Sequence, residues 1–306
     1  MPRGEDNSRF YGLFEMTDKF PTKVLVLGAT GMLGNAMLRV FAASPGCSAT
    51  GSARSAAGAR LLPESVRAAV HTGIDVENPD ALARLLGQVR PQVVVNCIGL
   101  VKQLAEADDP LAALPINAML PHRLSRLCAL VGARLVHIST DCVFAGTRGA
   151  YTEADAPDAQ DLYGRSKLLG EVTDDAHAIT LRTSIIGHEL ASTHGLVGWF
   201  LAQTGTVRGY AKAVFSGFPT VELAHIVRDH VLPRPDLHGL YQVSAAPIDK
   251  LALLRLVAAQ YGRSTQIVPD ERLVIDRSLD STRFRNATGY TPPDWPELVR
   301  RMHAFD

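Results

Sequence analysis

A phenol, an ammonium group and two hydroxyls lie near one another in the middle of this 306-residue chain. Tyr163 and Lys167 stand four residues apart in a segment with a helical pattern, so they share one face of the expected helix. Ser139 and Thr140 follow the apolar run from 135 to 138. Because a nearby cation favours a phenolate, we expect Lys167 to lower the pKa of Tyr163 from about 10 towards neutrality. Such a phenol exchanges a proton at physiological pH. The same spacing also occurs in helices where the tyrosine only packs and the lysine is only a solvated charge.

The element that would supply a partner for this chemistry stands near the start of the chain. The apolar run 23–27 is rich in strand formers and leads directly into a glycine-rich turn and a helical pattern through Phe41. Glycines let such a turn approach a pyrophosphate, whose charge is met by the amides and positive end of the following helix. The alternative is a merely tight turn between strand and helix. The predicted cofactor contacts here are Gly28, Thr30, Gly31, Met32, Leu33 and Gly34.

The end of the second expected strand favours one nicotinamide cofactor over the other. The strand near 47–51 ends in Ser52-Ala53-Arg54-Ser55, at the point where a carboxylate would bind the ribose 2′-hydroxyl. No acid is present there. Arg54 and the two serines suit a 2′-phosphate, so the sequence favours NADP(H), with NAD(H) left open as a second cofactor. The alternative is that Arg54 is a solvated loop residue.

Further strands extend the expected sheet. The run 71–76 places Asp75 and Val76 beside the adenine, although Asp75 suits a helix cap equally well. The apolar run 91–97 has the length of a strand buried on both faces. It opens into Cys97, Ile98 and Gly99, which we expect to lie against the cofactor. Ser139 and Thr140 stand at the carboxyl end of another strand, where ligands bind in doubly wound sheets.

Composition excludes several classes of protein. Lys+Arg and Asp+Glu are equal at 31 each, so nothing indicates a nucleic-acid partner. The four cysteines are far apart without a Cys-x-x-Cys pair, which is typical of small apolar residues in a reducing compartment. Residues 1–20 read as a flexible extension without the apolar segment of a signal peptide. No window approaches the roughly 18 apolar residues of a membrane span, so we expect a cytoplasmic protein with no membrane partner.

After about residue 187 the alternation of strands and helices becomes irregular, which indicates a second unit. The expected fold is α/β, a Rossmann-type doubly wound parallel sheet with a smaller C-terminal α/β substrate-binding domain. The sheet domain is expected to cover 21–187, joined by parts of 216–247, and the substrate domain 188–215 and 248–306. His188 and His194 are six residues apart, whereas the helical zinc motif needs four, so no metal site is predicted.

With the glycine turn, Ser139-Thr140-Asp141 and Tyr163 to Lys167 in this order, the chain resembles an extended short-chain dehydrogenase/reductase. Within that superfamily it is most similar to the dTDP-4-dehydrorhamnose reductase group, from about Lys23 to the C-terminus. The segments that carry this resemblance are 139–146, 181–184, 217–220 and 278–281.

The resemblance implies roles for the residues that match. Thr140, Tyr163 and Lys167 are the implied catalytic trio, and Tyr163, Lys167 and Ser139 also contact the cofactor. The implied reaction is reduction by NADPH of the C4 keto group of a nucleotide-linked 4-keto-6-deoxyhexose, in polysaccharide or O-antigen precursor synthesis. A homodimer is left open.

Two departures from the family pattern concern the substrate. Cys142 stands where the family has a tyrosine, and the region 199–215 matches the rhamnose enzymes poorly. The sugar and nucleotide are therefore open, with a UDP-linked 2-acetamido-4-keto-6-deoxyhexose as an alternative to the dTDP-linked one. The residues expected to contact substrate are Cys142, Phe144, His188, Trp199, Arg208 and Lys212.

The sequence leaves two other functions open. One is epimerisation or dehydration with a tightly held cofactor, although a dehydratase would usually carry a carboxylate pair beside the threonine and only Asp141 follows Thr140 here. The other is a binding protein, because the group includes a non-catalytic regulatory subunit of methionine adenosyltransferase that keeps the cofactor fold. The intact Thr140, Tyr163 and Lys167 weigh against it.

Overall fold

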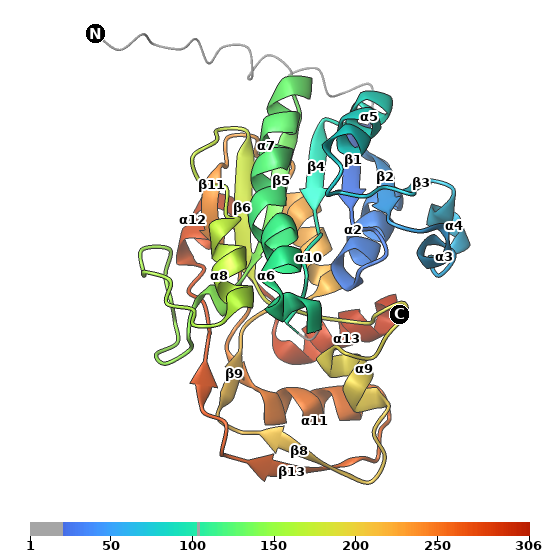
Figure 1. Cartoon of the computed structure of the whole chain (residues 1–306). Coiled ribbons are helices and arrows are strands. Elements are labelled where there is room, and N and C mark those ends of the chain that lie inside the picture. The colour runs from blue at the N-terminus through green and yellow to red at the C-terminus, as the bar shows by residue number, and fades with distance from the viewer. Residues whose placement is uncertain (1–20, 103–104) are drawn as a thin grey trace.

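The structure is a computed structural model that describes residues 21–102 and 105–306. The predicted extension at 1–20 lies outside the described residues. A large parallel sheet forms the centre of the molecule, with helices on both faces, and a group of shorter strands and helices lies beyond one end of it (Figure 1). The predicted Rossmann-type α/β fold is confirmed.

Seven strands form this sheet in the order β11-β6-β5-β4-β1-β2-β3, and all neighbouring pairs are parallel. The order reverses direction at β1, as in doubly wound sheets, so a crevice forms where the chain leaves to opposite sides. The strands are β1 (Thr22–Leu27), β2 (Cys47–Ala53), β3 (Val70–Thr72), β4 (Val93–Asn96), β5 (Arg134–Thr140), β6 (Ala178–Thr183) and β11 (Gly239–Gln242). The third strand is shorter than the expected 71–76.

Alternating side chains of the strands build two hydrophobic layers, since successive side chains point to opposite faces. Val24 and Val26 of β1 pack with α2 (Met32–Ala42) and α10 (Thr220–Ile226) on one face. Leu25 and Leu27 pack with α5 (Pro79–Val89) and α7 (Leu120–Val131) on the other. This burial on both faces explains why the strands read as continuous apolar runs.

The connections between the large-sheet strands are mostly helical. Asn78 accepts from the backbone amides of Asp80 and Ala81, which fixes the start of α5. The helices are α2 (Met32–Ala42), α3 (Ala56–Ala59), α4 (Glu64–Arg67), α5 (Pro79–Val89), η1 (Ala105–Asp108), α6 (Pro110–Ala113), the π-helical η2 (Leu114–Met119), α7 (Leu120–Val131), η3 (Asp141–Val143) and α8 (Leu162–Leu169).

Most of the remaining elements form small sheets and helices around β9 (Ala213–Phe215) and α11 (Lys250–Gln260) in the lower part of Figure 1, whereas α10 lies beside α2 and α12 (Thr282–Thr288) lies beside β11. Sheet pairings are β10 with β7, β12-β9-β14, and β13 with β8. The strands are β7 (Ile185–Ile186), β8 (Thr206–Tyr210), β9 (Ala213–Phe215), β10 (Phe218–Pro219), β12 (Ile248–Asp249), β13 (Gln266–Asp270) and β14 (Ile275–Asp276). The helices are α9 (Leu196–Leu201), α10 (Thr220–Ile226), the π-helical η4 (Val227–Val231), α11 (Lys250–Gln260), α12 (Thr282–Thr288) and α13 (Trp295–Phe305).

The chain returns to the large sheet after its first excursion. β11 adds to the edge of β6, with Gly239 opposite Ile179 and Gln242 opposite Arg182. Segment 216–247 thus contributes a strand to the large sheet, while β9 and β12 pair with each other in the small unit. The boundaries of the two domains stay a prediction. No helix in the described part of the chain is long and apolar enough to cross a membrane.

Candidate active site

Strand β5 delivers Thr140 to the carboxyl edge of the large sheet. Its hydroxyl accepts from the Cys142 amide at 3.1 Å, which starts the short turn η3, and donates to Asp141 Oδ1 at 3.2 Å. Thr140 is 8% exposed and Asp141 is 7% exposed, so water has little access to either. The threonine side chain is therefore held in one orientation by its own turn.

Helix α8 brings Tyr163 against this turn. Asp161 caps the helix by accepting from the Gly164 amide at 2.7 Å. Gly164 packs against the Cys142 carbonyl so closely that a Cβ at this position would overlap that oxygen. Because of this close approach, the phenol of Tyr163 and the hydroxyl of Thr140 form a side-chain hydrogen bond.

The expected effect of Lys167 on the phenol is wrong. Burial raises the pKa of Tyr163 above its ordinary value, and the nearby Cys142 and Asp141 groups raise it further, while the hydrogen bond with Thr140 opposes them. The sequence suggested a cation beside the phenol but not the loss of water around it, and desolvation disfavours the charged form. Tyr163 is therefore a protonated phenol at neutral pH in this structure, which suits a proton donor.

Lys167 lies one helical turn beyond Tyr163, with its ammonium group buried. Its Nζ donates to the backbone oxygen of Ile138 at 2.8 Å, which ties α8 to β5. Burial lowers the pKa of Lys167 to about 8, while Glu171 and Cys97 act to raise it. A hypothetical Cβ on Gly99 would be 3.8 Å from Nζ, so the lysine also borders the turn after β4.

A buried carboxylate stands behind these residues. Glu171, just after α8, accepts from Ser139 Oγ at 2.7 Å and from Arg182 Nε and Nη2 at 2.7 Å each. Sequence reasoning did not single out Glu171. The available signal was its position four residues after Lys167, which a helix continuing beyond Leu169 would place on the same side as that lysine.

Asn117 links three segments of the site. Its side chain accepts from the Leu100 amide at 2.9 Å and donates to the Leu100 oxygen at 3.2 Å and to Ser166 Oγ at 3.2 Å. The residue is 1% exposed, inside the π-helical turn before α7. The geometry therefore indicates that Asn117 is a cross-link between the Gly99 turn and α8.

The glycine turn after β1 fits a dinucleotide. Gly28 has φ +78°, a conformation that favours glycine, and a Cβ there would lie 2.8 Å from Ile98. A Cβ at Gly34 would overlap the Gly28 carbonyl, so helix α2 packs against the turn itself. α2 begins after Gly31 without a side-chain cap, which leaves its first amides available to an anion. Thr30 and Met32 are half-buried beside this turn, whereas Leu33 is buried in the core.

The polar side chains at the end of β2 are less free to bind a phosphate than expected. Ser52 is 2% exposed, and the Ser55 hydroxyl accepts from the Gly58 amide at 3.1 Å as the cap of α3. Arg54 is the exposed charged side chain of this group, and the exposed Ser55 is engaged in the cap. If a 2′-phosphate binds at this strand end, Arg54 is the residue that can reach it with a charged side chain.

Other predicted cofactor contacts lie along the same edge of the sheet. Asp75 accepts from the Glu77 amide at 3.0 Å and is exposed after β3, with Val76 half-buried beside it. Cys97 and Ile98 follow β4, and the Ile98 amide donates to Asn96 Oδ1 at 3.1 Å. Burial raises the pKa of the Cys97 thiol to about 12, so this cysteine is an uncharged residue at the predicted cofactor site.

The predicted substrate residues separate into two groups. Cys142 is half-buried next to Thr140, and burial raises the pKa of its thiol to about 12. Phe144 is fully buried, stacked on Tyr151 with ring centroids 4.1 Å apart, so its side chain does not reach open space.

The other four predicted substrate residues are His188, Trp199, Arg208 and Lys212. The contacts given for them are with residues other than Thr140 and Tyr163. His188 Nε2 is 2.7 Å from Tyr261 Oη and its Nδ1 is 3.5 Å from Asp306. Arg208 pairs with Asp270 at 3.9 Å and Lys212 with Glu271 at 2.8 Å. Trp199 is 37% exposed on α9. Their roles with a substrate stay predictions.

Two cations that sequence reasoning did not single out lie near the turn η3, which follows Thr140. Lys250 begins α11, and Arg277 follows β14. Both interact electrostatically with Asp141 and Cys142. Arg277 stands beside the 278–281 segment that carries part of the resemblance, but no local pattern connects it with Thr140.

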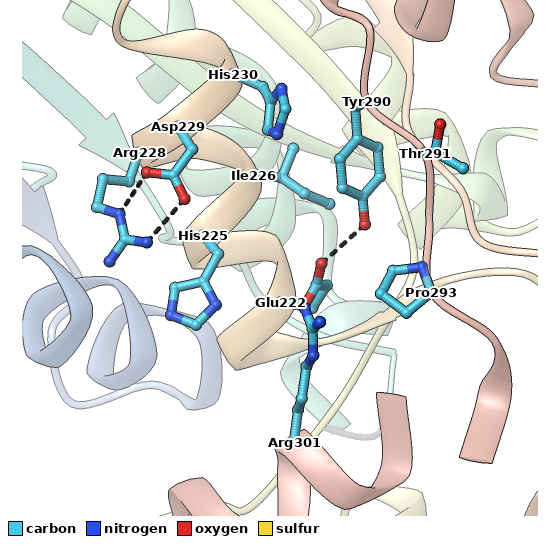
Figure 2. A pocket seen from close by; sticks show the side chains of 10 residues that line it. All are labelled: Glu222, His225, Ile226, Arg228, Asp229, His230, Tyr290, Thr291, Pro293 and Arg301. Carbon is cyan, nitrogen blue, oxygen red and sulfur yellow. Dashed lines mark hydrogen bonds and ion pairs between the residues drawn. The ribbon is translucent and has the colours of Figure 1, made fainter. Parts of the chain in front are cut away.

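A cavity of about 460 Å³ lies elsewhere, between α10 and the segment leading into α13 (Figure 2). Its charged side chains are paired internally: Arg228 with Asp229, and Glu222 with Arg301. Tyr290 Oη donates to Glu222 at 2.9 Å. The residues that line this cavity are separate from Thr140, Tyr163 and Lys167. Among the described residues, no three His, Cys, Asp or Glu side chains converge as a metal site requires.

The parallel sheet, the glycine turn and the Thr-Tyr-Lys cluster at its carboxyl edge define an extended short-chain dehydrogenase/reductase. Residues 22–210 match the family described as the RmlD substrate binding domain, and the chain belongs to that family.

Three relatives illustrate the range of that similarity. The chain is 30% identical over 175 residues to methionine adenosyltransferase 2 subunit beta of Rattus norvegicus, covering 55% of this chain and 48% of that one. It thus spans about half the length of that relative. It is 25% identical over 303 residues to dTDP-4-dehydrorhamnose reductase of Escherichia coli, covering 91% and 96% of the two chains. The solved dTDP-4-dehydrorhamnose reductase of Bacillus anthracis in complex with NADP has a TM-score of 0.75 at 21% identity, covering 93% and 99%.

Proposed function

We propose that this protein is an NADP(H)-dependent reductase of the C4 keto group of a nucleotide-linked 4-keto-6-deoxyhexose. The observation that carries the proposal is the arrangement of Thr140, Tyr163 and Lys167 at the carboxyl edge of the sheet, next to a glycine turn that fits a pyrophosphate. The near full-length similarity to the Escherichia coli reductase supports it.

Each side chain has a task that its surroundings favour. The hydride for the carbonyl comes from the nicotinamide cofactor when it is bound. Tyr163 is held protonated by burial and donates its proton to the developing alkoxide, while Thr140 supports the oxyanion and the phenol by hydrogen bonds. Lys167, fixed on the Ile138 oxygen, presents a positive charge that stabilises the phenolate once the proton has left.

The wider setting belongs to the same proposal. Residues 28–34 would hold the pyrophosphate and Arg54 the 2′-phosphate, with NAD(H) as a weaker second cofactor. The product would serve polysaccharide precursor synthesis in the cytoplasm. A homodimer is part of the same proposal.

The decisive experiment is incubation of the full chain with NADPH and a panel of dTDP- and UDP-linked 4-keto-6-deoxy sugars, with and without a 2-acetamido group. We expect stoichiometric NADPH oxidation with at least one sugar and a product with a new C4 hydroxyl. Product stereochemistry then identifies the sugar. Conversion of a sugar without net NADPH consumption would instead identify an epimerase or dehydratase.

A second candidate is a cofactor-binding regulatory subunit without turnover. The specific observation in its favour is the 30% identity to methionine adenosyltransferase 2 subunit beta. In that case NADPH would bind without oxidation on every sugar of the panel, and the chain would copurify with a partner enzyme. The intact Thr140, Tyr163 and Lys167 cluster favours the reductase.

A further inference from the structure

The cavity of about 460 Å³ beside α10 has the size of a small-molecule site, since ligand pockets in proteins typically measure about 300–1,000 Å³. It is built by three segments that are distant in the sequence: α10 with η4, the chain just before α13, and α13 itself. Figure 2 shows His225 and Asp229 on one side of it and Tyr290 and Pro293 on the other.

The carboxylates of this cavity already have donors. Asp229 accepts from Arg228 Nε at 2.6 Å and from Nη2 at 2.7 Å. Glu222, which is 3% exposed, accepts from Tyr290 Oη at 2.9 Å and from Arg301 Nη1 at 2.7 Å. Because each of these four oxygens has a donor, the two acids have little left to offer a cationic ligand.

Several nitrogen atoms of the cavity, in contrast, are without partners. The half-buried His225 has no hydrogen-bond or ion-pair partner within residues 21–102 and 105–306. Nδ1 of His230 is buried and also lacks one in the described part of the chain. Arg301 uses Nε on Glu297 and Nη1 on Glu222, and its Nη2 has no partner among the described residues. Unpartnered polar groups in such a place cost free energy, which a ligand that accepts hydrogen bonds would recover.

A π-helical turn sets the two histidines on one side of their helix. α10 passes into η4 at Val227, and the Leu232 amide donates to the Val227 oxygen, five residues back, at 2.8 Å. In a regular α-helix, residues five apart lie about 140° apart around the axis, so His225 and His230 would face different directions. The wider turn brings residues five apart above one another, and both histidines line the same cavity. π-helical turns are rare and frequently occur at functional sites, which points independently to a ligand here.

The charges around His225 suit an anion. Burial lowers the pKa of His225, and Arg228 and Arg301 lower it further, while Glu222 and Asp229 act to raise it. The imidazole is therefore uncharged at neutral pH in this structure. A bound anion favours the protonated ring, both of whose nitrogens then donate. The cavity can thus take up a proton together with an anion.

We propose that this cavity binds a phosphate dianion, either free or carried by a small organic phosphate, with His225, His230 and Nη2 of Arg301 as its donors. A phosphate accepts several charge-assisted hydrogen bonds at once, which suits donors that come from α10, η4 and α13. The ring of Tyr290 and Pro293 form a wall for an organic part on the other side. This site goes beyond the proposed reductase and does not depend on it.

The test measures binding rather than turnover. The full chain is saturated with NADP⁺, so that the cofactor site is filled, and titrated calorimetrically with inorganic phosphate, phenyl phosphate, benzoate and phenol. The variants are His225→Gln and His230→Gln, which keep a polar side chain but cannot take up a proton. His238→Gln is the matched control, because this exposed histidine does not line the cavity. Arg301 stays unchanged, since its loss would leave the buried Glu222 without its counter-charge.

We expect His225→Gln and His230→Gln each to weaken inorganic phosphate and phenyl phosphate about tenfold or more, and His238→Gln to bind both like the unmodified protein. Tighter binding of phenyl phosphate than of inorganic phosphate would identify an organic phosphate as the ligand, and equal binding would identify free phosphate. Unchanged affinity in both cavity variants, or benzoate or phenol bound as tightly as phenyl phosphate, would overturn the inference. Retained NADP⁺ affinity in each variant shows that the protein has folded.

Nuclear magnetic resonance of the histidine rings adds a readout at the site itself. The signal that disappears in His225→Gln identifies His225, and its titration is followed with and without phenyl phosphate. We expect the ligand to raise the pKa of His225, because the anion favours the protonated ring, and to leave the ring signals of His238 in place. A His225 titration that phenyl phosphate does not move would also overturn the inference.

Discussion

Arg182 and Glu171 form a buried ion pair in which two guanidinium nitrogens donate to the two carboxylate oxygens, each at 2.7 Å. Both side chains are 4% exposed. The carboxylate also accepts from Ser139 Oγ, so the pair joins β6, the end of α8 and the end of β5. It stands behind Lys167 and holds together the elements that carry Thr140, Tyr163 and Lys167.

Replacing Glu171 with glutamine should destabilise the protein strongly. The variant leaves the Arg182 guanidinium buried without its counter-charge, which typically costs about 3–5 kcal/mol. Denaturant unfolding at pH 7 measures the change in free energy of unfolding. Glu271→Gln is the matched control, because it breaks an exposed pair with Lys212, and such pairs are worth about 0–1 kcal/mol. Equal effects of the two variants would contradict a structural role for the buried pair.

The activity should depend on the protonation of Lys167. Its pKa is about 8, so kcat/KM should fall as pH rises through that value and the ammonium loses its proton. Glu171 acts to raise this pKa, and its removal therefore moves the alkaline limb of the Glu171→Gln profile to lower pH. Glu271→Gln should leave the limb unmoved. A Glu171→Gln profile that coincides with that of the unmodified protein would rule out the electrostatic link between these residues.

Tyr163→Phe should abolish most turnover while leaving cofactor binding intact. The variant removes the proton donor but keeps the ring that packs on the turn after β5, and general acid catalysis typically contributes about 10²- to 10⁴-fold. Single-turnover NADPH oxidation measures the chemical step, and fluorescence titration with NADPH provides the binding control. Turnover at the original rate would remove Tyr163 from the mechanism.

The glycine turn should tolerate no side chain at Gly34. A Cβ there would overlap the backbone oxygen of Gly28, which cannot move without disturbing the turn. Gly34→Ala is therefore expected to lose NADPH affinity and to lower the melting temperature. Gly46→Ala is the control, because a Cβ at that position meets no atom within 4 Å. Equal NADPH affinity in the two variants would show that the close approach of α2 to the turn is dispensable.

Local patterns predicted the large sheet because its strands are apolar runs buried on both faces and its first turn is marked by glycines. The same local reading placed Thr140 at a strand end and Tyr163 and Lys167 on one helix. It gave the wrong direction for the pKa of Tyr163, since burial depends on segments distant in sequence. Glu171 was missed for a related reason, because its carboxylate matters only once Arg182 and Ser139 are folded against it.

The contact between Arg277 and Phe144 shows most clearly what local sequence patterns cannot predict. The two residues are 133 positions apart, and their hydrogen bond depends on β14 pairing with β9 and lying beside the loop after η3. No periodicity in one segment encodes such a pairing. Residues such as Arg277, whose surroundings come from distant segments, are therefore the ones that sequence reasoning missed, while residues of the glycine turn and β5 were placed by their own neighbours in the chain.

The choice between NADP(H) and NAD(H) should depend on Arg54. With Ser52 buried and Ser55 used as a helix cap, Arg54 is the exposed charged group at the end of β2. Hydrogen bonds from a charged group are worth about 1.5–3 kcal/mol, so Arg54→Ala should raise the Kd for NADPH roughly 10- to 100-fold and leave that for NADH unchanged.

Paired titrations of both cofactors measure this selectivity. Arg84→Ala, which removes an exposed arginine from α5, should change neither affinity. Because the 2′-phosphate is the chemical difference between the two cofactors, the ratio of their affinities isolates the contact from any general change in net charge. Parallel weakening of both cofactors by Arg54→Ala would mean that Arg54 acts on a part they share, and the preference for NADP(H) would then need another residue.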